Sequence, residues 1–182
     1  MSISFHRWRK RILDSPRVNP VNAAPMWFGS IDELHHAGFK GFHSIAELRI
    51  TCLGDVPREK GVYVVVRDSR EPVRILPTSP AGHFKGKSPT VSTDLPTRKW
   101  VRDAFVVYIG KAGSENERAT LRSRLTAYLN FGSGMPVGHW GGRYIGQLAD
   151  ATDLVVWWKP QNVEKRILVF FLQFMSAKSL IQ

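Results

Sequence analysis

Apolar positions along the chain follow two different patterns: continuous runs typical of strands and a spacing typical of one helix face. Three runs rich in β-branched and aromatic residues predict strands, because such runs fit a pleated, buried surface. These runs cover residues 61–67, 104–110 and 153–159. Between the second and third runs, Leu121, Leu125 and Leu129 recur at the spacing of one helix face, which predicts a helix over 121–129.

Further helices are predicted at both ends of the chain. Ser30 and Ser44 each stand before a short periodic segment and are each followed three residues later by a glutamate. This spacing is typical of a capped helix start. Near the C-terminus, residues 163–175 are strongly apolar and predict a helix whose first turn contains Glu164.

The order of these elements predicts an α+β fold. We expect a small, mainly antiparallel three-stranded central sheet flanked by helices. Residues 70–100 contain five prolines and predict a long loop inserted between the first two strands. The expected organisation is an N-terminal extension, residues 1–55, followed by the main domain, residues 56–182.

The charge of the chain indicates a polyanionic partner. Lys and Arg number 26 against 15 acidic residues, so the formal net charge is +11. A surplus of this size favours nucleic acid as the partner. A basic N-terminal cluster is interleaved with Trp8, and it either follows a nucleic-acid backbone or is a frayed tail: Arg7, Arg9, Lys10 and Arg11.

Cysteine and hydropathy patterns exclude other classes. Cys52 is the only cysteine, so a disulfide framework and a Cys-rich zinc site are excluded. We find no secretory signal and no apolar run of bilayer length, and therefore expect a soluble cytoplasmic protein without a membrane partner. Neither the pair His35-His36 nor His139 has the spacing of a zinc site on one helix face.

Two short motifs stand at the predicted strand pair. The first strand begins with Gly61-Val-Tyr63, and the second ends with Tyr108-Ile-Gly-Lys111. They are followed by an arginine-bearing helix with Arg124 and then by Glu164 at a helix start. This ordered set resembles the GIY-YIG nuclease superfamily over residues 56–175. The long insertion and the segment 141–148 are similar to its restriction-enzyme-like bacterial branch.

The resemblance implies an endonuclease that hydrolyses phosphodiester bonds, with double-stranded DNA as the expected substrate. It implies that Tyr63 receives the proton of the attacking water and that Tyr108 orients that water or Tyr63. A phenol is a poor base at neutral pH unless its pKa is lowered. Lys111 is a candidate cation to favour the phenolate.

The remaining implied roles concern the phosphate and a metal. Arg124 would hold the scissile phosphate with its planar donor fork. Glu164 would bind one Mg²⁺ or Mn²⁺. Tyr128 lies one helical turn after Arg124, where many family members have a histidine, and it is either functional or part of the core. Three further residues are candidate nucleic-acid contacts: Arg122, Arg143 and Lys87.

Two alternatives stay open from the residues alone. Taken singly, Tyr63 and Tyr108 fit ordinary strand aromatics, and Glu164 fits a helix-dipole partner. Related proteins have a Pro and an Asn after the last helix, and this chain has neither after Asn162. The first alternative is a catalytically impaired nucleic-acid binder on the same fold, and the second is an unrelated α+β protein. A homodimer is possible and undecided.

Overall fold

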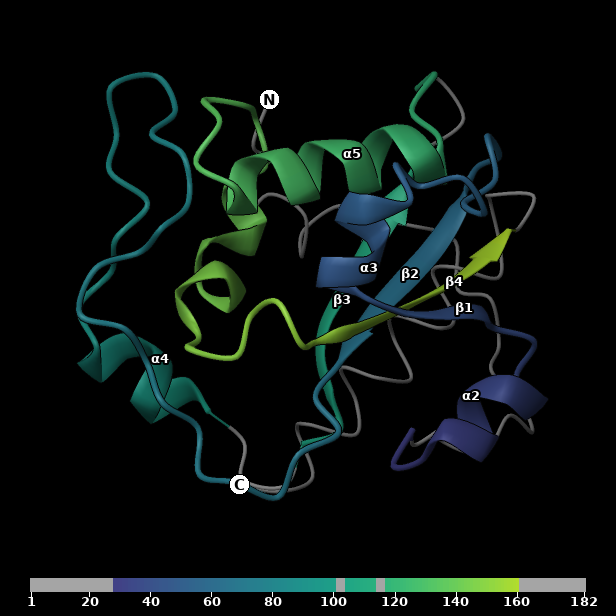
Figure 1. The fold of residues 1–182 in the computed structure, drawn as a ribbon, viewed down its shortest axis with the longest axis horizontal. Coiled ribbons are helices and arrows are strands. Elements are labelled where there is room, and N and C mark those ends of the chain that lie inside the picture. Colours follow the sequence, from purple (N-terminus) through teal and green to yellow (C-terminus); the bar gives the residue numbers. More distant parts are fainter. Residues whose placement is uncertain (1–27, 101–103, 114–116, 161–182) are drawn as a thin grey trace, which may run out of the picture.

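A four-stranded antiparallel sheet forms the centre of the computed structural model, which describes residues 28–100, 104–113 and 117–160 (Figure 1). The strand order is β1-β4-β2-β3. The α+β class is confirmed, whereas the expectation of three strands is wrong. The strands are β1 (Lys40–Ser44), β2 (Gly61–Val66), β3 (Val106–Ala112) and β4 (Val155–Pro160).

The additional strand β1 comes from the expected N-terminal extension and pairs with β4 at the sheet edge. Its alternation is broken by a register shift between Gly41 and His43, where Gly41 and Phe42 both adopt positive φ. A Cβ atom at Gly41 would lie 2.5 Å from the Trp158 ring, so this position requires glycine. The bulge hides the period of two, which explains why the sequence pattern did not predict this strand.

In the described part of the chain, four α-helices and two short 3₁₀ helices accompany the sheet. Ser30 Oγ accepts a hydrogen bond from the Glu33 N–H, and Ser44 forms a reciprocal capping box with Glu47, so both predicted helix starts are confirmed. The helices are α2 (Ile31–His36), α3 (Ile45–Ile50), α4 (Asp94–Lys99), α5 (Leu121–Gly132), η1 (Trp140–Arg143) and η2 (Ile145–Gln147). The helix predicted over 163–175 lies outside the described residues. No described helix has both the length and the apolar character needed to cross a bilayer.

The Pro-rich segment 70–100 is a long excursion that ends in α4 (Figure 1). The fully buried Gln147 fastens it to the rest of the molecule. Its side-chain amide donates to the carbonyls of Leu76 and Val91 at 2.8 and 2.9 Å, and its Oε1 accepts from the Val91 N–H at 3.0 Å. A further bridge pairs Ile75 with Leu148. The excursion is therefore held at both ends by one side chain.

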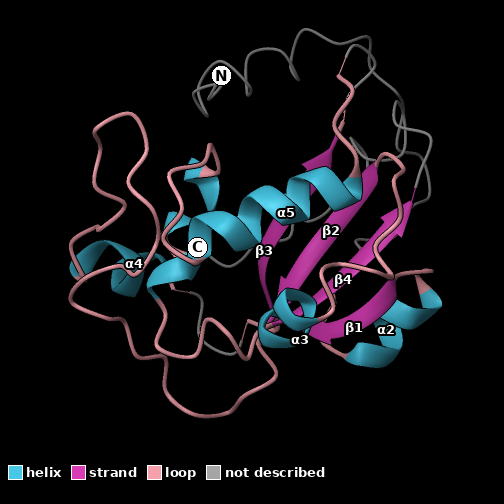
Figure 2. Cartoon of the chain, turned by 45° about the horizontal axis from the view of Figure 1, so that its top comes forward, coloured by secondary structure: helices cyan, strands magenta, loops and turns pink. Residues whose placement is uncertain are grey.

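Strand alternation gives the sheet two different faces. On the first face, Tyr63 and Val65 join the core under α3 and α5 (Figure 2). On the second face, Val62, Val64 and Val66 pack with apolar side chains that include those of α2 and β4. The candidate site lies on the first face.

Candidate active site

The pairing of β2 with β3 brings two tyrosines together. Tyr63 is paired with Gly110, and Val65 with Tyr108, so both phenols point to the first face. Their ring centroids are 6.0 Å apart. A Cβ atom at Gly110 would lie 2.1 Å from the Tyr63 ring, so that ring lies directly over the glycine. The glycine of the Tyr-Ile-Gly motif thus makes room for the tyrosine of the Gly-Val-Tyr motif.

Helix α5 adds an arginine and a third phenol. Arg124 and Tyr128 are one turn apart, as predicted, and both approach the tyrosine pair. The Tyr128 ring stacks on Tyr108 with centroids 5.9 Å apart and an interplanar angle of 6°. Arg124 is half-buried, and its Nε has no hydrogen-bond partner among the described residues. Its guanidinium also forms no ion pair with them, so it is available to bind an anion.

His139 completes the cluster, although no sequence pattern predicted it there. Its Nε2 lies 3.5 Å from Tyr63 Oη and 3.4 Å from Tyr108 Oη, and its ring lies 5.1 Å from that of Tyr128. Only 3% of its surface is exposed. A Cβ atom at Gly142 would lie 3.0 Å from His139 and 2.9 Å from Tyr128. The small residues that follow His139-Trp140 were the one sequence signal of this close packing.

Burial controls the protonation states of the cluster. Burial, followed by the neighbouring Tyr108, holds the pKa of Tyr63 well above its ordinary value, although the charge of Arg124 opposes this shift. Burial also raises the pKa of Tyr108 and of Tyr128. Burial, followed by the charge of Arg124, lowers the pKa of His139 to about 4. At neutral pH the phenols and the imidazole are therefore uncharged, and Arg124 makes the cluster cationic.

Lys111 does not join this cluster. The strand was predicted to end at Gly110, but β3 continues to Ala112. Lys111 is paired with Val62, whose side chain lies in the core of the second face. Since successive side chains of a strand alternate between faces, Lys111 is on the face opposite Tyr63. Its expected role of lowering the pKa of that phenol is therefore wrong.

The three candidate nucleic-acid contacts have different surroundings. Arg122 donates from Nε to the Val56 carbonyl and from a terminal nitrogen to the Gly54 carbonyl, each at 2.7 Å, and so fastens a loop. Arg143 is half-buried against the Trp140 and Tyr144 rings, at 5.1 and 4.3 Å. Lys87 is exposed in a turn of the Pro-rich segment, and of the three it is the one that faces solvent freely.

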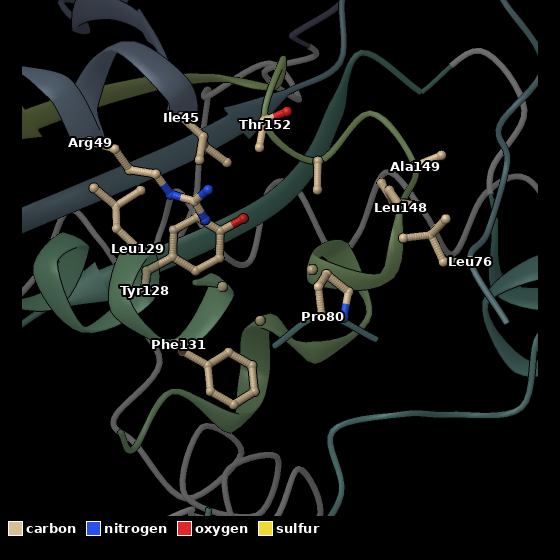
Figure 3. Close-up of a pocket in the computed structure, with 14 residues that line it drawn as sticks. Ile45, Arg49, Leu76, Pro80, Tyr128, Leu129, Phe131, Leu148, Ala149 and Thr152 are labelled. Atoms are coloured by element: carbon tan, nitrogen blue, oxygen red, sulfur yellow. The ribbon is translucent and has the colours of Figure 1, made fainter. Parts of the chain in front are cut away.

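A pocket of about 200 Å³ opens beside Tyr128 (Figure 3). Its walls are mostly apolar and come from α3, α5, the Pro-rich segment and residues 142–152. Figure 3 shows Arg49 reaching from α3 toward the phenol of Tyr128. Tyr128 thus belongs both to the wall of this pocket and to the tyrosine cluster.

The expected metal ligand, Glu164, lies outside the described residues. Within 28–100, 104–113 and 117–160, no group of three or more His, Cys, Asp or Glu side chains has an arrangement that could hold a metal ion. The groups around the two hydroxyls are phenols, an imidazole and a guanidinium. This set does not suit Mg²⁺, which prefers carboxylate and water oxygens.

Comparison of the chain with protein-family models, curated proteins and solved structures finds no match. The resemblance to the GIY-YIG superfamily therefore rests on the sequence motifs alone.

Proposed function

We propose that this chain is a GIY-YIG-type endonuclease that hydrolyses phosphodiester bonds in double-stranded DNA. One observation carries the proposal. The guanidinium of Arg124 forms no hydrogen bond or ion pair with any described residue, and its charge acts on the phenols of Tyr63 and Tyr108. A half-buried cation without a partner among the described residues is a candidate site for an anion, and the net charge of +11 favours a polyanion.

The cluster offers the groups that phosphodiester hydrolysis requires. Arg124 binds the scissile phosphate through its donor fork and stabilises the negative charge that develops in the transition state. Tyr108, which is half-buried, positions the attacking water at the entrance of the cluster. Tyr63, which lies behind it, receives the proton of that water. Tyr128 stacks on Tyr108 and fixes the plane of its ring.

Glu164 is the one residue to which we assign the binding of Mg²⁺ or Mn²⁺. Because the described groups around the hydroxyls do not suit a hard cation, no step is assigned to a metal here. The prediction is that cleavage requires a divalent cation, is abolished by EDTA and is lost in Glu164→Gln. A wild-type rate that is unchanged in EDTA would contradict the metal requirement without contradicting cleavage.

The second candidate is a catalytically impaired nucleic-acid binder on the same fold. The burial of Tyr63 favours it, because none of this side chain is exposed to the water that it would have to activate. Binding would then depend on charge alone, and affinity would fall steeply as salt rises. The two candidates differ in whether the bound DNA is cut.

The decisive experiment compares two arginines of one helix. Long genomic DNA, which offers many short target sequences, is incubated with the wild type, Arg124→Met and Arg122→Met in the presence of Mg²⁺ or Mn²⁺. We expect Arg124→Met to lose about 10²–10³-fold in cleavage rate, as is usual when a transition-state charge partner is removed. Arg122→Met loses two hydrogen bonds to backbone carbonyls, so its stability falls while its cleavage persists below its melting temperature.

Each result has a clear meaning. Cleavage by the wild type and by Arg122→Met, but not by Arg124→Met, supports the nuclease. DNA that stays intact with the wild type, while binding weakens as salt rises, contradicts it and favours the binder. Equal cleavage by both variants would contradict the assignment of Arg124 to the phosphate.

A further inference from the structure

His139 lies where a single acceptor atom serves both hydroxyls of the candidate site. Its Nε2 is 3.5 Å from Tyr63 Oη and 3.4 Å from Tyr108 Oη. The imidazole is held from three sides, by the phenols of β2 and β3 and by Tyr128 of α5. His139 belongs to the loop before η1 and is distant in sequence from both strands.

A phenol that acts alone would be a poor base in these surroundings. Burial disfavours the Tyr63 phenolate and raises the pKa of that phenol, and Arg124 only partly opposes the shift. A phenol that accepts a proton from water while it gives up its own proton never becomes charged. Such a transfer needs an uncharged acceptor within reach of Tyr63 Oη. Among the described residues, His139 has the nitrogen at that position.

We propose that His139 is the final acceptor of the proton that Tyr63 takes from the attacking water, an inference that rests on the proposed function. In this step an O–H bond of water breaks and its proton passes to Tyr63 Oη. The proton of Tyr63 moves to His139 Nε2, and the water oxygen forms the new bond to phosphorus. The bond from phosphorus to the 3′ oxygen breaks, and that oxygen takes a proton from solvent. The imidazolium returns its proton to solvent after the product leaves.

The step requires one tautomer of the histidine. Nε2 must carry the lone pair, so the hydrogen is assigned to Nδ1. Nδ1 is buried and has no acceptor in the described part of the chain, so the assignment rests on the two phenols, each of which can donate to Nε2. Because Nε2 has one lone pair, it accepts a hydrogen bond from only one of the two tyrosines, Tyr63 or Tyr108, at a time. When it accepts from Tyr63, Tyr108 is left to donate to the water or to the phosphate.

The basicity of His139 depends on the charged and titratable groups that face it, and through Arg124 it also depends on bound substrate. They are Tyr63 of β2, Tyr108 of β3, and Tyr128 and Arg124 of α5. Burial and the charge of Arg124 hold its pKa at about 4, so the imidazole is uncharged at neutral pH but is a weak base until that charge is offset. A phosphate bound to Arg124 offsets that charge and removes the second cause of the lowering. Substrate binding therefore makes the imidazole more basic.

The test measures cleavage under single-turnover conditions across pH 5–9. It uses the full chain as wild type, His139→Gln and His139→Ala, with DNA binding and melting temperature measured in parallel. Glutamine accepts a hydrogen bond from a phenol but does not take its proton. We expect His139→Gln to bind DNA as the wild type does and to lose about 10²–10⁴-fold in cleavage rate, the range for a lost proton acceptor. Added imidazole should restore part of the rate in His139→Ala, increasingly as the pH rises and neutral imidazole predominates.

A second measurement does not depend on activity. Nitrogen NMR of the ¹⁵N-histidine-labelled wild type, with His139→Gln to assign the signal, should show a neutral imidazole protonated at Nδ1 at pH 7. Cleavage by the folded His139→Gln within about threefold of the wild type, or a proton on Nε2 in the NMR spectrum, would overturn this inference and leave the nuclease intact. Intact DNA with the wild type would overturn the proposed function, and with it this relay.

Discussion

The two faces of the central sheet are built from the same strands and differ in what they bury. Val62, Val64 and Val66 turn to the second face, where their neighbours are aliphatic and aromatic. Tyr63 turns to the first face, where phenols, an imidazole and a guanidinium meet beside an apolar core. Polar groups are costly to bury and contribute less to stability than apolar ones of the same volume. The comparison indicates that the second face serves packing and that the first contributes less to stability, because it buries the polar groups that the proposed function would use.

The largest expected effect comes from adding one methyl group to the first face. Gly110→Ala would place a Cβ atom 2.1 Å from the Tyr63 ring, which has no free space because the tyrosine is fully buried. We expect the free energy of unfolding to fall by about 3 kcal/mol or more, as overpacking in a closed core does. Urea denaturation measures the change.

A matched glycine provides the control for that substitution. The nearest heavy atom to a Cβ at Gly146 is 3.6 Å away, on Ala81, which is ordinary contact. Gly146→Ala should leave stability unchanged or raise it by about 0.5 kcal/mol through the unfolded state. Equal losses from the two substitutions would show that the Tyr63 ring does not lie over Gly110.

The next effect concerns acid, because the first face buries an uncharged histidine. The pKa of His139 is about 4 in the folded chain against 6.5 for an ordinary histidine, so the unfolded chain binds more protons between these values. The stability that depends on a neutral His139 is therefore present above pH 6.5 and is lost as the pH falls toward 4. The loss is about 3 kcal/mol, since one pKa unit corresponds to about 1.4 kcal/mol.

The measurement is the difference in unfolding free energy between pH 7 and pH 4.5, for the wild type and for His139→Gln. The variant has no imidazole and should lose less stability than the wild type over this range. The same slope in both proteins would mean that other groups cause the acid sensitivity and that the first face carries no buried neutral histidine.

The smallest effect separates two neighbouring residues that face opposite ways. Val64→Ala removes buried methyl groups from the second face and should cost about 2 kcal/mol while cleavage persists. Tyr63→Phe removes only a hydroxyl and should leave the melting temperature nearly unchanged while cleavage is lost. Circular-dichroism melts and plasmid cleavage measure both variants side by side. Loss of cleavage in a well-folded Val64→Ala would break the division of labour between the faces.

The sequence predicted the elements whose pattern is local. The β2, β3 and β4 strands follow from β-branched runs, and α5 from the recurrence of Leu121, Leu125 and Leu129. The capped starts at Ser30 and Ser44 follow from the glutamate three residues later. Strand β1 did not follow, because Gly41 and Phe42 break its alternation with a bulge.

The candidate site was predicted in part for the same reason. Tyr63, Tyr108 and Arg124 come together because strand pairing and helix spacing place them, and both are readable from motifs. Lys111 was misplaced because β3 was expected to end at Gly110, whereas it continues to Ala112 and strand alternation places Lys111 on the face opposite Tyr63. His139 was missed because its position depends on the path of the loop after α5, which no local pattern specifies.

The hydrogen bonds that join Gln147 to Leu76 and Val91 have a practical consequence. Because one side chain holds both Leu76 and Val91, the intervening chain begins and ends at nearly the same point. The entropic cost of closing such a loop grows slowly with its length, by about 0.6 kcal/mol for each doubling. Gly86 lies within it at a positive φ, and a Cβ atom there would have no neighbour within 4 Å. The loop is therefore a suitable insertion site, where an affinity tag or a fluorescent reporter can be added without disturbing the sheet.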